Sequence, residues 1–192
     1  VFGYPEPFGV PNEFFLVGGK KMSSSKGHGY SARDLVALVP PRILRLALFQ
    51  KDVNQQINFD PAGDTIPLLF DRYDVIAEKH FSGVNDADTR LFLYSHTPEE
   101  RKNIVKRYLP RFSLVAFIVQ MPHLNLEEEV AKMKGGELTK EDATELELRA
   151  KYARIWLERA ASEDYKFTLQ KDAVPESAKS FTDAQKQALK HV

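Results

Sequence analysis

The most informative part of the sequence is a short loop that reads Lys21-Met22-Ser23-Ser24-Ser25-Lys26-Gly27. An apolar run typical of a β-strand precedes it from Glu13 to Val17, and Gly18-Gly19 ends that run. After the loop, Ser31-Ala32-Arg33-Asp34 has the pattern of a capped helix start. A strand therefore leads into a loop of small and cationic residues, and a helix follows.

This composition suits a loop that binds a polyphosphate. Small side chains let the backbone approach phosphate oxygens closely, and lysine is a flexible point charge that can follow a phosphate group as its bonds change. Lys21 and Lys26 supply that charge here. A solvated loop without a ligand is the alternative that composition alone leaves open.

Beyond the loop the sequence is mainly helical. Apolar residues recur at intervals of three and four and predict one buried helix face, formed by Ile66, Leu69, Phe70, Tyr73, Ile76 and Ala77. Further helix starts or helices are predicted at Pro41, Thr97, 126–134, Thr139 and Thr182. Ile57 to Asp60 is a candidate short strand.

An apolar segment and two acidic segments predict which residues lie in the core and which are exposed to solvent. Residues 112–121 are apolar all round and are expected at the centre of the core, with Phe112, Phe117 and Trp156 as core residues. The acids of 127–129 and 141–147 are expected to be solvated helix beginnings that hold no metal.

Composition excludes several classes of protein. The chain has 192 residues, with 27 Lys and Arg against 27 Asp and Glu, so bulk electrostatic coating of nucleic acid is not expected and any contact with nucleic acid must be local. It has no cysteine, which fits a reducing compartment such as the cytoplasm, and its five histidines show no metal-ligand spacing. The longest apolar run is too short to cross a membrane.

The flanking residues give the loop a specific resemblance. Residues 21–27 are similar to the KMSKS motif of class I aminoacyl-tRNA synthetases, the mobile loop that stabilises ATP phosphates. The strand and Gly-Gly before the motif, and the segments that follow it, resemble the class I lysyl-tRNA synthetase family. Those segments are 31–35, Pro41-Arg42-Ile43-Leu44-Arg45 and Ile57-Asn58-Phe59-Asp60, with weaker support from Trp156-Leu157-Glu158 and Tyr165-Lys166-Phe167.

The resemblance implies a mainly α fold in two parts. Residues 1–64 would hold a small α/β remnant, namely the end of a nucleotide-binding domain with the KMSKS-type loop and a stem-contact segment. Residues 65–192 would form a helical, bundle-like region of the type that binds the tRNA anticodon.

The implied function is ATP-dependent ligation of lysine to tRNA, with ATP as substrate together with Mg²⁺ and with no metal site in this chain. Neither DNA nor a membrane is an expected partner. Lys21 and Lys26 would be catalytic, and ATP would bind Lys21, Met22, Ser23, Ser24, Ser25, Lys26 and Gly27. Arg33, Arg42, Arg45 and Lys51 would contact tRNA.

Two departures from the family pattern matter. Ser24 stands where KMSKS has its second lysine, and Lys26 follows two places later, so the division of phosphates between Lys21 and Lys26 is open. The family's His-x-Gly-His type motif is absent, and the sequence starts at Val1. We therefore expect a portion of a longer enzyme, inactive alone because the first half of the ATP site is missing.

Two other readings stay open at this point. One is a non-enzymatic helical module that binds tRNA or a protein. The other is a different class I synthetase, such as an arginyl enzyme. The cations from Arg101 to Arg111 are expected to be structural, because acids at a helix start and bases toward its end suit the helix dipole.

Overall fold

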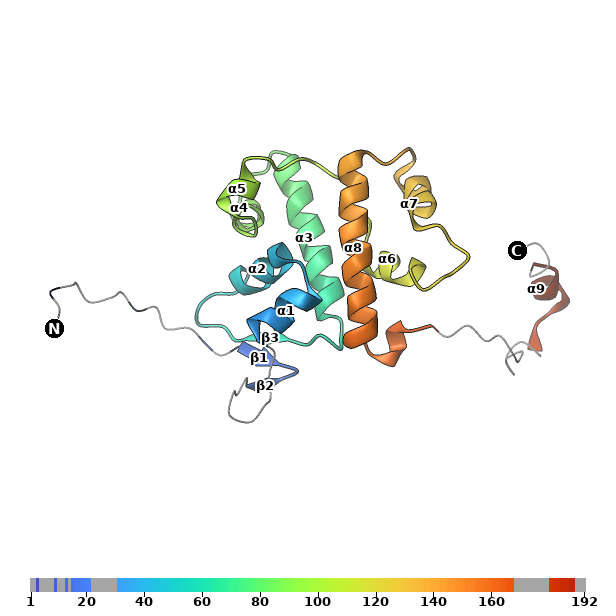
Figure 1. Cartoon of the computed structure of the whole chain (residues 1–192), viewed down its shortest axis with the longest axis horizontal. Coiled ribbons are helices and arrows are strands. Elements are labelled where there is room, and N and C mark those ends of the chain that lie inside the picture. The colour runs from blue at the N-terminus through green and yellow to red at the C-terminus, as the bar shows by residue number, and fades with distance from the viewer. Residues whose placement is uncertain are drawn as a thin grey trace.

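The computed structural model describes Gly3, Gly9, Glu13 and residues 15–21, 31–167 and 180–188. The described part is mostly helical with one small sheet, as the sequence predicts (Figure 1). Its strands are β1 (Phe15–Val17), β2 (Lys20–Lys21) and β3 (Ile57–Phe59), in the order β2-β1-β3. β1 is antiparallel to β2 and parallel to β3. Residues 22–27 of the predicted ATP-binding loop lie outside the described residues.

Most of the helices follow the predicted starts. In chain order the helices are α1 (Ala32–Leu38), α2 (Pro41–Phe49), α3 (Thr65–Phe81), α4 (Ala87–Tyr94), α5 (Pro98–Arg101), α6 (Phe112–Ile118), α7 (Leu126–Lys134), α8 (Lys140–Arg159) and α9 (Asp183–Ala188), with a 3-10 turn η2 at Glu163–Tyr165. Of these, α4 and α6 begin where the sequence predicts no helix start.

Local hydrogen bonds explain where these helices begin and end. Ser31, Thr97 and Thr139 each cap a helix: the side chain accepts from the amide three positions later, and the amide of the cap residue donates in return to the side chain at that position. Gly135 ends α7 with φ 77°, a left-handed conformation that favours glycine. The helix from Thr97 is short, however, and ends at Arg101. The dipole argument places the cations from Arg101 to Arg111 toward the end of this helix. Arg101 does lie in its last turn, but the cations of 102–111 lie beyond the helix, so the argument is wrong for them.

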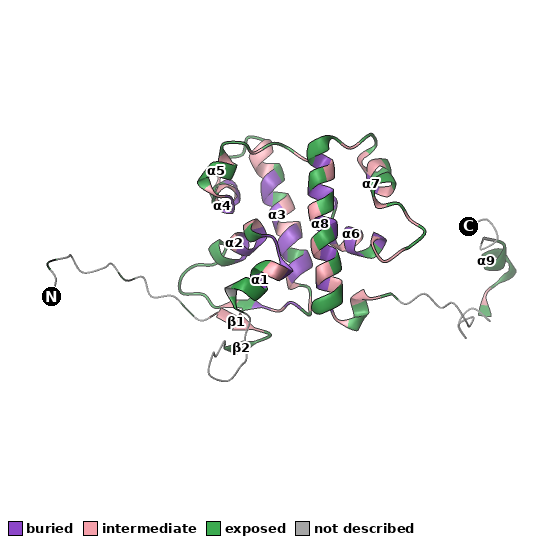
Figure 2. Ribbon diagram, viewed as in Figure 1, coloured by how far each residue is buried: buried purple, intermediate pink, exposed green. Residues whose placement is uncertain are grey.

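One hydrophobic core joins the two long helices. The predicted face of α3 is buried along its whole length, and α8 buries Leu146, Ala150, Ala153 and Trp156 (Figure 2). Phe112 of α6 links them, because its ring stacks on Phe70 at 4.1 Å between centroids. The core also includes α1 and α2, so it extends across residue 64. The division into 1–64 and 65–192 stays a prediction.

The expectation that 112–121 is central throughout is wrong for Phe117. That side chain is 41% exposed and packs edge to face with Phe167, at 5.1 Å between ring centroids. The reason is that α6 lies against α8 and α3 with only one side. The described residues include no helix long and apolar enough to cross a membrane.

Candidate functional site

The predicted phosphate loop leaves the sheet through a tight hairpin. Val17 pairs with Lys20 and Leu16 with Lys21, so Gly18 and Gly19 make the turn. Both glycines have positive φ, 54° and 74°, which other residues adopt only with strain. This hairpin sends the chain from β2 directly into residues 22–30.

Strand β3 fixes the position of that hairpin. The Gly18 amide donates to the Phe59 carbonyl at 3.1 Å, and the Gly19 amide donates to Asn58 Oδ1 at 2.9 Å. Phe15 also stacks on Phe59, with ring centroids 6.4 Å apart. The sequence indicates Asn58 only as part of the resemblance of 57–60, and its side-chain bond to the turn is visible only in the tertiary structure.

The far end of the loop is fixed by the start of α1. The Ser31 amide donates to Asp34 Oδ2 at 2.8 Å, while the Asp34 amide donates to Ser31 Oγ at 3.2 Å. The bond from the Ser31 hydroxyl lowers the pKa of Asp34. Leu35 and Leu38 of the same helix are buried in the core. The segment between Lys21 and Ser31 therefore starts and ends on structured backbone.

The four predicted tRNA contacts divide into two kinds. Arg33 on α1 and Lys51 after α2 are exposed. Arg45 lies 3.7 Å from Glu100 and donates to the Ser95 carbonyl at 3.5 Å. Arg42 points inward: its side chain is 11% exposed and its Nη2 donates to both oxygens of Glu145 at 2.6 Å.

Arg42 is part of a buried ion cluster centred on α8. Glu145 also accepts from Arg149 Nε at 2.9 Å and from Arg107 Nη1 at 3.5 Å. Arg149, which is fully buried, forms a bidentate pair with Asp74 of α3 and donates to a backbone carbonyl at residue 110. The cluster ties α2, α3 and α8 together with the segment that follows α5.

The expectation that the acids of 141–147 are solvated is wrong for Asp142 and Glu145. Both are buried, and Asp142 accepts from the Tyr108 amide at 2.6 Å and from Lys134 Nζ at 2.7 Å. The helical repeat is the reason, because positions 142, 145 and 149 lie on the same side of α8 as Leu146 and Ala150. The signal available in the sequence is the spacing of Asp142, Glu145 and Arg149, which places these charged residues on the apolar face of the helix.

Glu145 stays ionised because the arginines around it lower its pKa by more than burial raises it. Burial alone would raise the pKa of Glu145, but Arg42 and Arg149 more than compensate and the pKa is lowered. Asp74 is different: burial raises its pKa to about 6 despite the bonds from Arg149. Glu145 is therefore the anion on which the three arginines converge.

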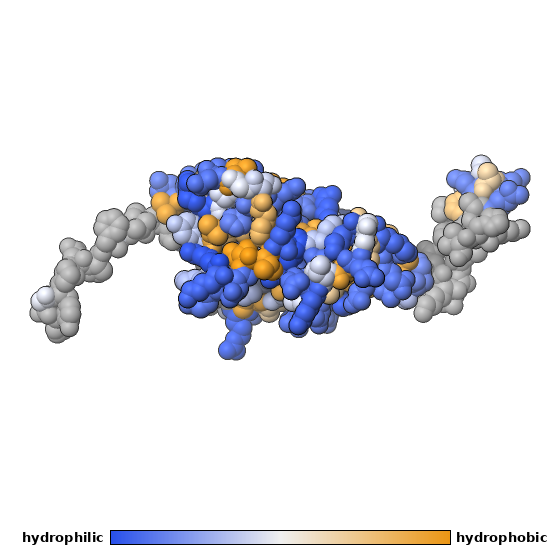
Figure 3. All heavy atoms as spheres, turned by 90° about the horizontal axis from the view of Figure 1, so that it is seen from above, coloured by the Kyte–Doolittle hydropathy of each residue, from blue (hydrophilic) through white to orange (hydrophobic). Residues whose placement is uncertain are grey.

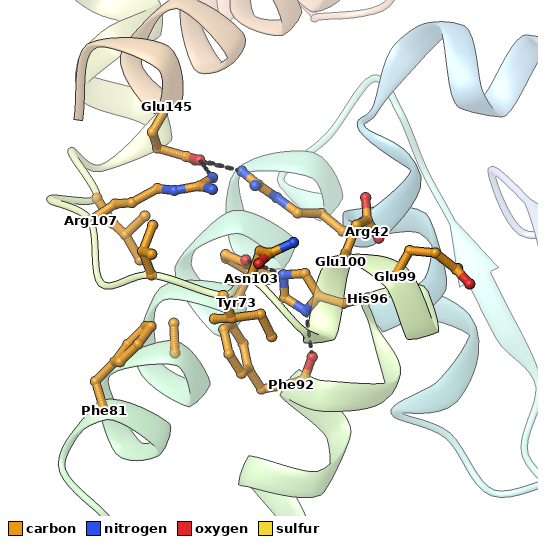
Figure 4. Close-up of a pocket in the computed structure, with 14 residues that line it drawn as sticks. Arg42, Tyr73, Phe81, Phe92, His96, Glu99, Glu100, Asn103, Arg107 and Glu145 are labelled. Atoms are coloured by element: carbon orange, nitrogen blue, oxygen red, sulfur yellow. Dashed lines mark hydrogen bonds and ion pairs between the residues drawn. The ribbon is translucent and has the colours of Figure 1, made fainter. Parts of the chain in front are cut away.

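A cavity of about 430 Å³ opens beside this cluster (Figure 4). Arg42 and Arg107 reach toward Glu145 from opposite sides of the view, and Asn103 and His96 lie below them in the same view. Within the part of the chain that the structure describes, two buried side-chain nitrogens find no hydrogen-bond partner, Arg42 Nε and Arg107 Nε. Leaving a buried charged donor unpaired costs about 1–3 kcal/mol or more.

His96 in the cavity wall is held as a neutral ring. A carbonyl only accepts, so His96 Nδ1 donates to the Phe92 carbonyl at 2.9 Å and Nε2 accepts from the Tyr73 hydroxyl at 3.1 Å. Burial lowers the pKa of His96, opposed in part by the bond to Phe92. No spacing in the sequence indicates a partner for this histidine.

A pH dependence of stability follows from His96. The unfolded chain takes up a proton near the ordinary pKa of about 6.5, whereas the folded chain resists it, so the contribution of His96 to stability should fall below that pH by up to about 1.4 kcal/mol per pH unit. The raised pKa of Asp74 acts in the opposite direction, so the prediction concerns the difference between wild type and His96→Gln. His96→Gln should remove this loss. Urea unfolding from about pH 7 to about pH 5.5 measures it, with exposed His123→Gln as the matched control. A wild-type slope unchanged by His96→Gln would contradict the assignment.

Among the described residues no group of three or more His, Cys, Asp or Glu side chains could hold a metal ion.

Comparison with known proteins places the chain. The family model described as tRNA synthetases class I (K) matches residues 1–108. A lysine–tRNA ligase of Pyrococcus furiosus is 31% identical over 180 residues, which cover 88% of this chain and 34% of that protein. One from Archaeoglobus fulgidus is 28% identical over 193 residues, covering 99% of this chain and 36% of that protein.

With its helical fold and a hairpin that leads into a KMSKS-type sequence, the chain belongs to the class I tRNA synthetase family. Within that class the match is to the lysine type, and the similar curated proteins are archaeal lysine–tRNA ligases. The chain spans about a third of the length of these relatives.

Proposed function

We propose that this chain is the part of a lysine–tRNA ligase that supplies the phosphate-stabilising loop and helices that contact tRNA. The observation that carries the proposal is the family match over residues 1–108 together with relatives named lysine–tRNA ligase that align along most of the chain. The same relatives favour lysine over arginine as the amino acid. A cytoplasmic location goes with this role.

The chemistry proposed for the loop is electrostatic. In the first step the carboxylate of lysine attacks the α-phosphorus of ATP, which forms lysyl adenylate and releases pyrophosphate. Lys21 and Lys26, with donors from 23–25, stabilise the negative charge that grows on the leaving pyrophosphate. ATP enters as a substrate with Mg²⁺ on its phosphates.

The anchors of the loop support this role. The Gly18-Gly19 turn and the Ser31 cap hold its two ends, while the residues between them carry the cations. Fixed ends limit the positions that Lys26 can reach, so less entropy is lost when the loop closes on phosphate. Contact with the backbone of tRNA is proposed for Arg33, Lys51 and Arg45. It is also proposed for Arg42, whose side chain would have to keep its ion pair with Glu145 while it contacts tRNA.

The proposal predicts that the isolated chain does not catalyse lysine-dependent exchange of pyrophosphate into ATP. Catalysis needs adenine, ribose and lysine held together, and the His-x-Gly-His type motif that the family uses for adenine is not in this sequence. A full-length protein that contains the chain should catalyse the exchange. The measurement is isotope exchange for both proteins at equal concentration, with arginine replacing lysine as the control.

The outcomes separate the readings. Exchange by the chain alone would contradict the dependence on an upstream half. No exchange and no lysylation of tRNA by the full-length protein, with tRNA binding retained, would favour the non-enzymatic module. Exchange that depends on arginine would overturn the choice of lysine.

A further inference from the structure

The hairpin that leads into the lysine loop is short and lies at an edge of the sheet. Its second strand, β2, consists of Lys20 and Lys21, which are both exposed and pair with β1 through two residue pairs. The hairpin lies at the lower edge of the molecule in Figure 1, on the side away from the mixed polar and apolar face seen in Figure 3. Its direction therefore depends on the turn that joins its two strands.

That turn is permissive by itself. Gly18 and Gly19 both have positive φ, and neither has a Cβ atom that would restrict its backbone. In a two-residue hairpin the flanking pair of residues closes the turn, so the amides of the two turn residues are left for other elements. β3 accepts both of them. The Gly18 amide donates to the Phe59 carbonyl at 3.1 Å, and the Gly19 amide donates to Asn58 Oδ1 at 2.9 Å.

The two bonds differ in how they depend on the sequence. The acceptor for Gly18 is a backbone carbonyl, which any residue at position 59 provides. The acceptor for Gly19 is a side-chain oxygen, which only a residue with an acceptor of that length provides. Asn58 is an exposed residue, so its side chain is not needed to fill the core. Position 58 is therefore where the sequence of β3 controls the turn.

The backbone of Asn58 is held firmly enough to fix the turn. Its neighbour Phe59 is 1% exposed in the hydrophobic core. The parallel ladder pairs Asn58 with Leu16 of β1. After the strand, the Asp60 amide donates to Thr65 Oγ1 at the start of α3, at 3.3 Å. A continuous series of contacts thus leads from the core through Asn58 to the Gly19 amide.

We propose that Asn58 is a positioning residue for adenylate formation, because its bond to the Gly19 amide sets the direction in which β2 presents Lys21 to the phosphates of ATP. The inference rests on the proposed function of the loop. Lys21 lies two residues after Gly19, about 7 Å along a strand, so a rotation at the turn displaces it directly. Cations stabilise a developing charge best when they are held in place beforehand.

Amide hydrogen exchange in the whole 192-residue chain tests the contact. Asn58→Leu keeps the size of the side chain and removes the acceptor, so the Gly19 amide should exchange about fivefold faster or more. The Gly18 amide is the internal control and should stay within about twofold, because its acceptor is backbone. Asn58→Asp keeps an acceptor and should leave both amides near wild type. Unchanged exchange at Gly19 in Asn58→Leu, or equal acceleration at both glycines, overturns the proposal.

Single-turnover formation of lysyl adenylate by the full-length enzyme tests the consequence. Asn58→Leu should be about fivefold to tenfold slower, the effect of one hydrogen bond, while the KM for lysine stays within about twofold. Asn58→Asp should restore the rate to within about threefold of wild type. Asn54→Leu is the matched control, because it is the same substitution at an exposed position four residues earlier, and its rate should stay within about twofold.

The outcomes distinguish this inference from the proposed function. If Lys26→Ala slows adenylate formation and Asn58→Leu does not, the loop acts as proposed and the role of Asn58 is wrong. If the wild-type enzyme forms no lysyl adenylate, the proposed function fails and the role of Asn58 fails with it. A slow Asn58→Leu that Asn58→Asp does not rescue, or a loss that appears in the KM for lysine, makes Asn58 a structural residue only and overturns the inference.

Discussion

Glu145→Gln is expected to lower the free energy of unfolding of the chain by about 3–5 kcal/mol, the cost of breaking a buried ion pair from one side. Glu145 is 1% exposed and accepts from Arg42, Arg107 and Arg149. Its loss leaves three guanidinium groups with Asp74 as the remaining carboxylate of the cluster. The substitution therefore removes the attraction between Glu145 and the three arginines, and it also leaves the positive charges of those arginines to repel one another.

Trp156 makes the effect measurable, because it is the single tryptophan and is fully buried. Urea unfolding followed by its fluorescence gives the free energy, and exposed Glu147→Gln is the matched control, expected within about 0.5 kcal/mol of wild type. Arg42→Met combined with Glu145→Gln should cost less than the sum of the single changes. Equal stability of Glu145→Gln and Glu147→Gln would remove the cluster as a determinant of the fold.

Lys26→Ala in the full-length enzyme is expected to lower the rate of adenylate formation by about 10²-fold or more. The charge on pyrophosphate appears in the transition state, so the loss should be in kcat while the KM for lysine stays nearly unchanged. Lys21→Ala should act in the same direction with a smaller effect.

Lys20→Ala is the matched control, because Lys20 is exposed on β2 beside the loop. Single-turnover formation of lysyl adenylate separates the chemical step from lysine binding. A rise in the KM for lysine with kcat intact would contradict the role given to the loop, and so would equal losses in Lys20→Ala and Lys26→Ala.

Local rules accounted for the helices. Ser31, Thr97 and Thr139 cap as predicted, since a capping box depends on residues three positions apart. The buried face of α3 and the end of α7 at Gly135 also follow from spacing and backbone preference over short distances. None of these depends on where the rest of the chain lies.

The direction of charged side chains could not be predicted in the same way. The resemblance implies tRNA contact for both Arg42 and Arg45, yet Arg42 turns inward and meets Glu145, a residue 103 positions later in the sequence. Phe117 shows the converse, because an apolar segment with one packed side leaves an aromatic ring half outside.

The sequence by itself determined the helical class, most of the helix starts, the strand that precedes the lysine loop and the family to which that loop points. The tertiary structure alone decided that Asp142, Glu145 and Arg149 lie in the interior, that Asn58 holds the Gly19 turn, and that a cavity adjoins Arg42 and Arg107. The physical reason is range. Caps, turns and periodic faces are set by neighbours within a few residues, whereas burial of a charge is stable only when partners from distant segments converge on it.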